Sequence, residues 1–385
     1  MKNRFVAERI ADQPVTLMHR LQTMKAGMDD AIDLSLGDPD FVTPAPILEA
    51  GYRDALAGYT KYSNVKGYPD VIRSVASYYK RELGLDVPEK RIIVVASGNY
   101  AGFLACFSTL DPGDEVLIPD PCFISYKRQI EFSGGIAVPV PTREEDGWQL
   151  RPEVLERYVT PKTKAMFINS PCNPTGACMD RKALEKIADF AKAHDLLVIS
   201  DEIYTWFDFT GGFCSMLQIP GMADRTIIIN SMSKNYVATG ARIGWMIAPE
   251  EIIEAIANEG LYIAFAPPSI SQRMAKFALD EGKELMQPIL NEFRERMCLA
   301  AERINRIPHL HVQDPPQGTF YLFVNIKETG LTSEEFVIKV LEEAHVAVIP
   351  GNNFGDAGNG YVRICTTVSS ETLLEALDRI EALHL

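Results

Sequence analysis

Short apolar runs alternate with amphipathic stretches through the middle of the chain. The runs are continuous, a pattern that favours strands covered on both faces of a parallel sheet. We expect strands at Arg91–Ala96, Glu115–Ile118, Ile136–Val140, Ala165–Asn169, Leu196–Ser200, Thr226–Asn230 and Ile243–Ala248. Between two of them, Arg181–His194 places Leu184 and Ile187 on one helical face behind Asp180, a suitable N-cap. The pattern predicts an α/β fold with a mostly parallel central sheet between helices.

The pattern changes after Pro267 and Pro268. Residues 269–306 are predicted to be helical, with interruptions near Gly282 and Pro288. Two short strands are expected after them, at Thr319–Val324 and Tyr361–Ile364. Two helices are also expected: one begins at the capping box of Thr332 and Glu335, and the other covers Ser370–Leu383. Because one core rarely extends beyond about 250–300 residues, we expect two domains. The large one covers residues 46–275, and a smaller α+β domain combines residues 1–45 and 276–385.

Charge and composition narrow the class of protein. The 385 residues carry a formal net charge of −14, which argues against a nucleic-acid-binding protein because such proteins usually present a basic surface. No signal peptide or membrane partner is expected, since the N-terminus is charged and no stretch approaches ~18 uninterrupted apolar residues. The seven cysteines form no CxxC pair and the six histidines are dispersed. These features favour a cytoplasmic protein with reduced thiols and no metal site.

Polar residues and a glycine follow several of the predicted strands. Lys234, Asp201 and Asn173 each come just after an apolar run, and Gly98 lies between an apolar run and a helix. Ligands of parallel α/β sheets bind at the carboxyl ends of the strands, so these residues are candidates for one site. The amides at the start of the helix after Gly98 would suit an anion. Taken alone, Lys234 is compatible with a solvated lysine at a strand end, Asp201 with a helix cap, and Asn173 with a tight turn.

Together, the segments resemble the class I/II aminotransferases, which are fold-type-I enzymes that depend on pyridoxal 5′-phosphate. The segment with Lys234 has the motif Ser-x-Ser-Lys-(x)7-Arg-x-Gly. The other matching segments, in order, are Leu34–Phe41, Tyr62–Gly67, Ser97–Asn99, Pro119–Phe123, Asn173–Gly176, Asp201–Tyr204 and Tyr361–Ile364. The resemblance covers essentially the whole chain and implies the fold and the cofactor of that family.

The resemblance implies catalytic roles for three residues. Lys234 would hold the cofactor as a Schiff base and, once a substrate amine replaces it, would move a proton from Cα. Asp201 would face the pyridine nitrogen and keep the ring protonated, so that the ring withdraws electrons from Cα. Tyr204, together with Asn173, would donate hydrogen bonds to the phenolic oxygen of the cofactor.

Further contacts to the cofactor follow from the same resemblance. Phe123 would stack on the ring, although an apolar residue here is also compatible with plain core packing. The implied phosphate contacts are the side chains of Ser231 and Arg242 and the backbone amides of Gly98, Asn99 and Tyr100. Tyr62 resembles the tyrosine that reaches the phosphate of a neighbouring subunit, which implies a homodimer with shared active sites.

The resemblance also implies how substrates bind. Arg363 would grip the α-carboxylate with its planar fork, Asn173 would lie beside it, and Gly37 would leave room for it. The substrates would be an L-amino acid and a 2-oxo acid, with the 2-oxoglutarate/glutamate pair as one partner. The side chain beyond Cα is not specified, because the phosphate turn at Ser97–Tyr100 has no lysine. An apolar pocket that also tolerates aromatic side chains, formed by Tyr100, Phe265 and Tyr59, is equally compatible.

Two alternatives to transamination stay open: a lyase of the same fold, and a non-catalytic binding or regulatory protein. A lyase of the same fold, such as one that catalyses β-elimination of sulfur, begins with the same cleavage of the Cα–H bond. A non-catalytic regulator would carry a DNA-reading domain, for which too few residues precede the first motif. A pseudoenzyme would have lost Lys234 or Asp201, and both are present. Transamination is the favoured interpretation.

Overall fold

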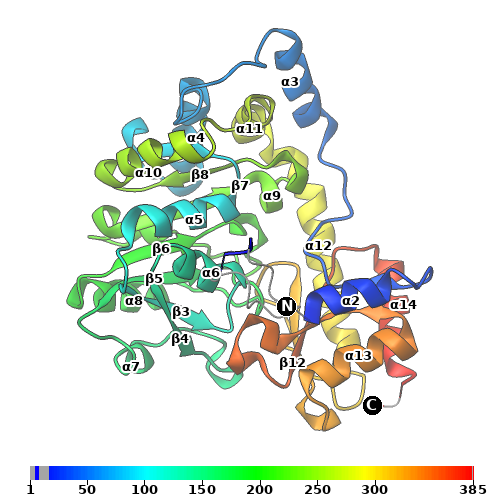
Figure 1. Cartoon of the computed structure of the whole chain (residues 1–385). Coiled ribbons are helices and arrows are strands. Elements are labelled where there is room, and N and C mark those ends of the chain that lie inside the picture. Colours follow the sequence, from blue (N-terminus) through cyan, green and yellow to red (C-terminus); the bar gives the residue numbers. More distant parts are fainter. Residues whose placement is uncertain (1–4, 8–16, 384) are drawn as a thin grey trace.

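The computed structural model describes residues 5–7, 17–383 and 385. At its centre is a seven-stranded sheet with the order β2-β8-β7-β6-β5-β3-β4 (Figure 1). The strands are β2 (Ile92–Val95), β3 (Glu115–Asp120), β4 (Ile136–Pro141), β5 (Thr163–Asn169), β6 (Leu197–Asp201), β7 (Thr226–Ser231) and β8 (Gly244–Ile247). Strand β8 pairs antiparallel with β2 and with β7, and all other neighbouring strands of this sheet are parallel. The mostly parallel sheet is therefore confirmed, and each predicted strand lies within two residues of its expected ends.

Helices cover both faces of this sheet (Figure 1). The helices are α5 (Gly98–Thr109), α6 (Ser125–Phe132) and α10 (Glu250–Ile263) on one face, and α4 (Pro69–Leu83), α8 (Arg181–Ala193) and α11 (Ser269–Glu281) on the other. In β7, Ile227 and Ile229 join the buried cluster with α5 and α10, whereas Ile228 joins the cluster with α4 and α8. Because successive side chains point to opposite covered faces, the three consecutive positions at the centre of the strand, 227–229, are all apolar.

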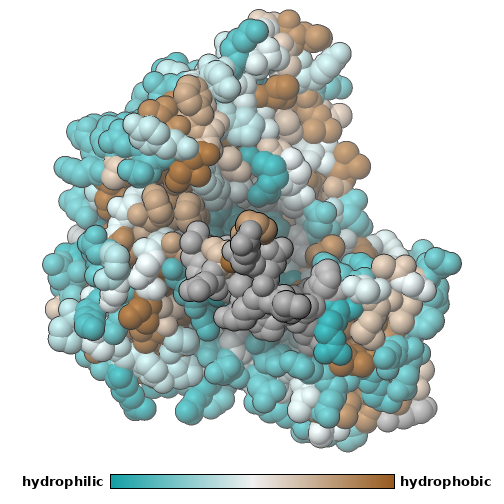
Figure 2. Space-filling view, viewed as in Figure 1, coloured by the Kyte–Doolittle hydropathy of each residue, from teal (hydrophilic) through white to brown (hydrophobic). Residues whose placement is uncertain are grey.

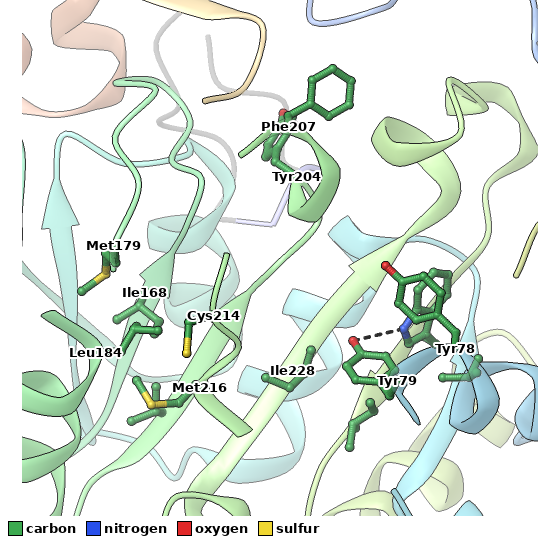
Figure 3. Packing of buried hydrophobic residues seen from close by; sticks show 14 of the residues in the cluster. Tyr78, Tyr79, Ile168, Met179, Leu184, Tyr204, Phe207, Cys214, Met216 and Ile228 are labelled. Atoms are coloured by element: carbon green, nitrogen blue, oxygen red, sulfur yellow. Dashed lines mark hydrogen bonds between the residues drawn. The ribbon is translucent and has the colours of Figure 1, made fainter. Parts of the chain in front are cut away.

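The helix predicted after Asp180 shows how local sequence sets the packing. The Asp180 carboxylate accepts a hydrogen bond of 2.8 Å from the amide of Ala183, which starts α8 where it was expected. The apolar face of α8 then packs on the sheet, and Leu184 lies beside Ile168 of β5 (Figure 3). At the other end of the same cluster, the Tyr79 hydroxyl accepts a hydrogen bond of 3.5 Å from the Trp245 indole.

A second buried cluster lies around smaller sheets. Its strands are β9 (Tyr321–Asn325), β12 (Tyr361–Cys365) and the parallel pair β1 (Ile32–Asp33) and β10 (Val346–Ala347). Its helices include α2 (Leu17–Lys25), α13 (Ser333–Ala344) and α14 (Ser370–Glu381). Strand β11 (Ile349–Pro350) pairs antiparallel with β12 and completes the sheet of β9 and β12. The predicted capping box starts α13, with hydrogen bonds of 3.2 and 2.9 Å exchanged between Thr332 and Glu335. The pairing of β1 with β10 brings the N-terminal segment into this cluster.

One long helix, α12 (Lys283–Ile304), connects the two buried clusters. The predicted interruption at Gly282 is present, but the one at Pro288 is wrong, because this exposed proline lies inside α12. Burial of Met286 and Phe293 on the first cluster compensates for the single backbone hydrogen bond that proline removes. Met297 already belongs to the second cluster, so we move the proposed domain boundary from residue 275 into α12.

The remaining α-helices of the described residues are α3 (Ala45–Leu56), α7 (Pro152–Leu155) and α9 (Met232–Asn235). Helix α3 packs on α11 at one end of the molecule (Figure 1). Across the described part of the chain, no helix is both long enough and apolar enough to cross a membrane.

Candidate active site

A cavity of about 160 Å³ opens at the carboxyl ends of the parallel strands, beside the first turn of α5. The predicted residues that line it are Gly98, Asn99, Phe123, Asp201, Ser231, Lys234 and Arg242. Parallel strands end at the same edge of a sheet, and for this reason the last residues of β6 and β7 lie close together. The structure therefore brings these predicted residues, which are far apart in the sequence, into one cavity.

Lys234 lies in α9, directly after β7, and its amine lies beside a backbone carbonyl and an aromatic ring. Its Nζ donates a hydrogen bond of 2.6 Å to the carbonyl oxygen of Gly37 and lies 5.6 Å from the centre of the Phe320 ring. Burial, followed by the nearby Arg363 cation, lowers the pKa of Lys234 from its usual value of 10.5 to about 8. The amine is therefore more easily deprotonated than an ordinary lysine, as a nucleophile or a base requires.

Asp201 is a buried carboxylate at the end of β6. Its Oδ2 accepts a hydrogen bond of 2.6 Å from the hydroxyl of Tyr126, and its Oδ1 accepts one of 3.3 Å from the amide of Ile203. Burial raises the pKa of Asp201 to about 6, although the hydrogen bond from Tyr126 opposes that change. A cation placed beside this carboxylate would be stabilised by a charge that little water screens.

The start of α5 provides an anion-binding geometry. The Ser97 hydroxyl accepts a hydrogen bond of 3.1 Å from the amide of Tyr100, while the earlier amides of Gly98 and Asn99 are among those that a helix leaves without partners. Gln129, whose side-chain amide donates to the Asn99 carbonyl at 2.8 Å, holds this turn in place. The cavity also contains the Ser231 hydroxyl and Arg242, so its anion-binding groups gather at one end.

Arg363 lies on β12 and is buried beside the amide side chain of Asn173. Its Nη1 donates to Asn173 Oδ1 at 2.8 Å and its Nη2 donates to the carbonyl oxygen of Ser35 at 2.7 Å, while its buried Nε has no partner. Both acceptors are neutral, and no carboxylate among the described residues forms an ion pair with Arg363. A buried cation without an anion is costly, so this site is suited to a ligand carboxylate.

Two aromatic rings enclose the guanidinium of Arg363. Its Cζ lies 4.2 Å from the centre of the Tyr321 ring and 4.8 Å from that of Phe354. The hydroxyl groups of Tyr321 and Tyr204 lie 2.9 Å apart, and both tyrosines are buried. A Cβ atom on Gly37 would lie only 1.9 Å from the Tyr321 hydroxyl, which explains why glycine occupies that position. Arg363, Asn173, Tyr204 and Gly37 therefore meet around Tyr321.

Four of the predicted cofactor-binding residues do not line the cavity within one chain. Asn173 and Tyr204 lie in the cluster around Arg363 and Tyr321, whereas Tyr100 and Tyr62 lie elsewhere. The amide of Tyr100 is used by Ser97, and its ring lines a separate small cavity next to Phe265. Tyr62 is 82% exposed and packs against Phe265, with ring centres 4.7 Å apart. A contact from Tyr62 to the cofactor would therefore have to be made in a second copy of the chain.

The side chains of the cavity fit the cofactor that the resemblance implies. Asp201 provides a buried carboxylate for a protonated ring nitrogen, and Phe123 provides an apolar wall for a planar ring. The start of α5 and Arg242 suit a phosphate, and Lys234 provides a reactive amine. The chemistry of these groups matches the ring, the phosphate and the aldehyde of pyridoxal 5′-phosphate.

Sequence reasoning missed three residues that the site uses. Tyr126 donates to Asp201, Gln129 orders the turn at Asn99, and Tyr321 touches both Arg363 and Tyr204. The only signal for Tyr126 was a polar aromatic residue one helical turn after Phe123, close to the end of a predicted strand. No comparable signal marks Tyr321, which begins β9 and packs in the first buried cluster.

Comparisons with known proteins find relatives that match nearly the whole chain. A family model described as aminotransferase class I and II matches residues 29–380. An aspartate aminotransferase of Pyrococcus abyssi is 41% identical, and an aromatic-amino-acid aminotransferase of Thermococcus litoralis is 39% identical, each over 94% of both chains. A double mutant of the Thermus thermophilus aspartate aminotransferase has a similar solved structure, with a TM-score of 0.93 and 32% identity over 99% of this chain and all of that chain.

Proposed function

Since the chain belongs to the class I and II aminotransferases and uses pyridoxal 5′-phosphate, we propose that Lys234, Asp201 and Arg363 are the residues with which it transfers an amino group. The amino group moves between an L-amino acid and a 2-oxo acid. The proposal includes Tyr204 as a catalytic residue and extends to the cofactor contacts described above. The relatives compared above are aminotransferases, and none of them supports the lyase alternative.

The observation that carries this proposal is the buried guanidinium of Arg363 without a carboxylate partner. All amino acids and 2-oxo acids share a carboxylate next to the reacting carbon, and the planar fork of arginine matches it. Arg363 also lowers the pKa of Lys234, which places the cation near the amine. A substrate held by its carboxylate would therefore present its Cα to Lys234.

Each residue has a distinct task in the proposed reaction. When bound, pyridoxal 5′-phosphate supplies an aldehyde that takes up the amino group and a protonated ring that withdraws electrons from Cα. Arg363 and Asn173 orient the substrate carboxylate, and the neutral Nζ of Lys234 accepts the proton from Cα. Asp201 would stabilise the positive charge of the bound ring, and Tyr204 would donate a hydrogen bond to the phenolic oxygen of the cofactor.

We propose the 2-oxoglutarate/glutamate pair as one substrate couple and leave the second amino acid open. The relatives named above act on aspartate and on aromatic amino acids, so the family does not point to one side chain. Tyr100 and Phe265 line a different small cavity, and Tyr59 stacks on Arg273 at 4.2 Å. These aromatic residues therefore supply no side-chain pocket at Lys234 within one chain.

We also propose that the enzyme works as a homodimer. Apolar side chains gather over α3, α10 and α11 (Figure 2). The exposed residues there include Leu48, Tyr52, Leu56, Leu261, Tyr262, Ile263, Phe265 and Ile270. A second copy on this face would bury them and would bring Tyr62 to the neighbouring phosphate site. Sedimentation analysis should give the mass of two chains, and a monomer with full activity would contradict this part of the proposal.

The cysteines support a cytoplasmic location for the enzyme, which is also part of the proposal. All seven are free, and four of them are buried: Cys106, Cys122, Cys214 and Cys365. Reduced thiols are usual in the cytoplasm and unusual in secreted proteins.

A half-reaction tests the proposed transfer. The loaded enzyme is mixed with one amino acid at a time, without any 2-oxo acid, and the products are measured. Glutamate should yield about one equivalent of 2-oxoglutarate per active site, and added 2-oxo acid should complete the cycle. The Lys234→Ala variant is the control and should yield none. Release of ammonia together with a 2-oxo acid would instead indicate a lyase.

A further inference from the structure

The side chain of Tyr321 contacts both Arg363 and Tyr204 in the candidate active site. Its ring faces the Arg363 guanidinium at 4.2 Å, and its hydroxyl lies 2.9 Å from that of Tyr204. We propose that Tyr321 is a positioning residue with two separable roles. The ring holds the carboxylate-binding arginine, and the hydroxyl directs the hydrogen bond that Tyr204 makes to the cofactor. The proposal rests on the function assigned above to Arg363 and Tyr204.

The first role follows from how Arg363 is stabilised before substrate binds. Two hydrogen bonds to neutral acceptors fix its terminal nitrogens, and no described carboxylate neutralises its charge. The negative faces of aromatic rings attract a guanidinium without occupying its N–H groups. Tyr321 and Phe354 can therefore stabilise the cation and keep the remaining N–H donors free for the substrate. A carboxylate partner in the same place would compete with the substrate.

The second role follows from the donor and acceptor capacity of two hydroxyl groups. Each tyrosine has a single proton to donate. If Tyr204 donates its proton to the cofactor, its oxygen must accept the proton of Tyr321 across the 2.9 Å contact. Burial raises the pKa of Tyr321 to about 12, so its hydroxyl keeps this proton throughout the neutral range. Hydrogen bonds in such a chain strengthen one another, which makes Tyr204 a better donor.

The position of Tyr321 is fixed by its neighbours in the chain. Its amide donates a hydrogen bond of 3.0 Å to Thr319 Oγ1, and Thr319 has a left-handed backbone with φ of 62°. A Cβ atom on Gly176 would lie 3.1 Å from the carbonyl oxygen of Tyr321, so the segment that carries Asn173 packs closely against it. Asn173 and Tyr321, which both contact Arg363, are thus packed against each other's segments, and the Tyr321 ring has little freedom to move.

Two substitutions separate the roles, and another tyrosine provides matched controls. Tyr321→Phe keeps the ring and removes the hydroxyl, whereas Tyr321→Leu removes both. Tyr361 makes the same kinds of contact outside the site, because its ring lies 4.4 Å from Lys327 Nζ and its hydroxyl donates to Glu144 at 3.0 Å. Tyr361→Phe and Tyr361→Leu therefore report the effect of changing a buried tyrosine on the adjacent strand. Circular dichroism verifies that each variant folds.

The first measurement is the Kd of the loaded enzyme for succinate and for 3-phenylpropionate, which carry a carboxylate but no reacting group. Tyr321→Leu should weaken binding about fivefold to thirtyfold, and Tyr321→Phe should stay within about twofold of the unaltered enzyme. The second measurement is a pH titration of the absorbance of the bound cofactor. Without the Tyr321 hydroxyl, Tyr204 is a weaker donor and stabilises the deprotonated form of the bound cofactor less. Tyr321→Phe should therefore raise the pKa seen in this absorbance titration by about half a pH unit or more.

The outcomes separate this inference from the function on which it rests. If Arg363→Ala binds the two carboxylates as well as the unaltered enzyme does, the function assigned to Arg363 is wrong. If Arg363→Ala loses binding while Tyr321→Leu keeps it, only the role of the ring is wrong. An unchanged titration in Tyr321→Phe overturns the role of the hydroxyl. Equal changes in the Tyr361 variants would overturn both roles, because they would reflect a general disturbance of the two strands.

Discussion

The candidate active site has two halves that hold opposite charges in different ways. The cofactor half comprises Asp201, Lys234 and the start of α5, and its buried anion receives hydrogen bonds from Tyr126 and Ile203. The carboxylate half comprises Arg363, Asn173 and Tyr321, and its buried cation is held by neutral acceptors and aromatic faces. The Asp201 carboxylate therefore has hydrogen-bond donors within the protein, whereas the Arg363 guanidinium has no carboxylate partner among the described residues.

This difference corresponds to how long each ligand stays. A cofactor remains bound through many turnovers, so its charge can be paired with a permanent carboxylate. A substrate carboxylate arrives and leaves in every turnover, and an internal anion at Arg363 would have to be displaced each time. Aromatic faces stabilise the waiting cation without competing for its N–H groups. The comparison predicts that substitutions in the two halves change different measured quantities.

The largest effect is expected from the anion of the cofactor half. Asp201→Ala should fold but lose about a thousandfold or more in kcat, because the ring nitrogen would lose its charge partner and the ring its electron-withdrawing power. Asp208→Ala, which removes a carboxylate outside the cavity, is the control and should be nearly normal. Steady-state kinetics together with circular dichroism measure both properties. A near-normal kcat in Asp201→Ala would refute its role.

The cation of the carboxylate half should mainly affect substrate binding. Arg363→Ala should raise KM about tenfold to a hundredfold for every amino acid, because each substrate loses a charge-assisted hydrogen bond. Arg296 is an equally buried arginine, but it has carboxylate partners in Asp40 and Glu292. Arg296→Ala should therefore lower the melting temperature and leave KM unchanged. An effect of Arg363→Ala on one substrate alone would mean that Arg363 recognises a side chain.

Lys234 lies between the halves, and its reactivity should follow its lowered pKa. Only the neutral amine attacks an aldehyde, so adduct formation between the apoenzyme and pyridoxal 5′-phosphate should rise about tenfold per pH unit at acidic pH. The rise should level off above about 8, where the amine is mostly neutral, whereas an ordinary lysine would continue to gain up to 10.5. Borohydride trapping followed by peptide mapping measures the rate and the position. An adduct on another lysine would contradict the assignment.

The smallest effect is expected from the hydroxyl of Tyr126. Its hydrogen bond lowers the pKa of Asp201, so Tyr126→Phe should raise that pKa above about 6 and weaken cofactor binding about fivefold. Tyr236 is a control, because its buried hydroxyl has no hydrogen-bond partner among the described residues. Cofactor affinity at pH 6 and pH 8 measures the difference, which should be larger at pH 6. Equal affinities in Tyr126→Phe and the unaltered enzyme would leave Tyr126 without this role.

The two halves also differ in how well the sequence predicts them. Asp201, Lys234 and Gly98 follow apolar strands, and parallel strands end at one edge, so the pattern alone indicates a common site. Arg363 and Gly37 are assigned by resemblance, because antiparallel pairing and the approach of a distant segment leave no periodic signal. The contact between Tyr126 and Asp201 joins residues 75 positions apart, and it depends on the packing of α6. Such contacts follow from side-chain geometry, which hydrophobic patterns do not encode.

The continuity of α12 has a practical consequence for protein engineering. Phe293 belongs to one buried cluster and Met297 to the next, and only one helical turn separates them. The two parts of the enzyme are therefore joined by a hydrogen-bonded rod here, with no flexible linker at which the chain could be divided. Expressing the two parts of the chain as separate polypeptides would require cutting this helix. The cut would expose apolar side chains of both fragments to water, so insoluble products are the expected result.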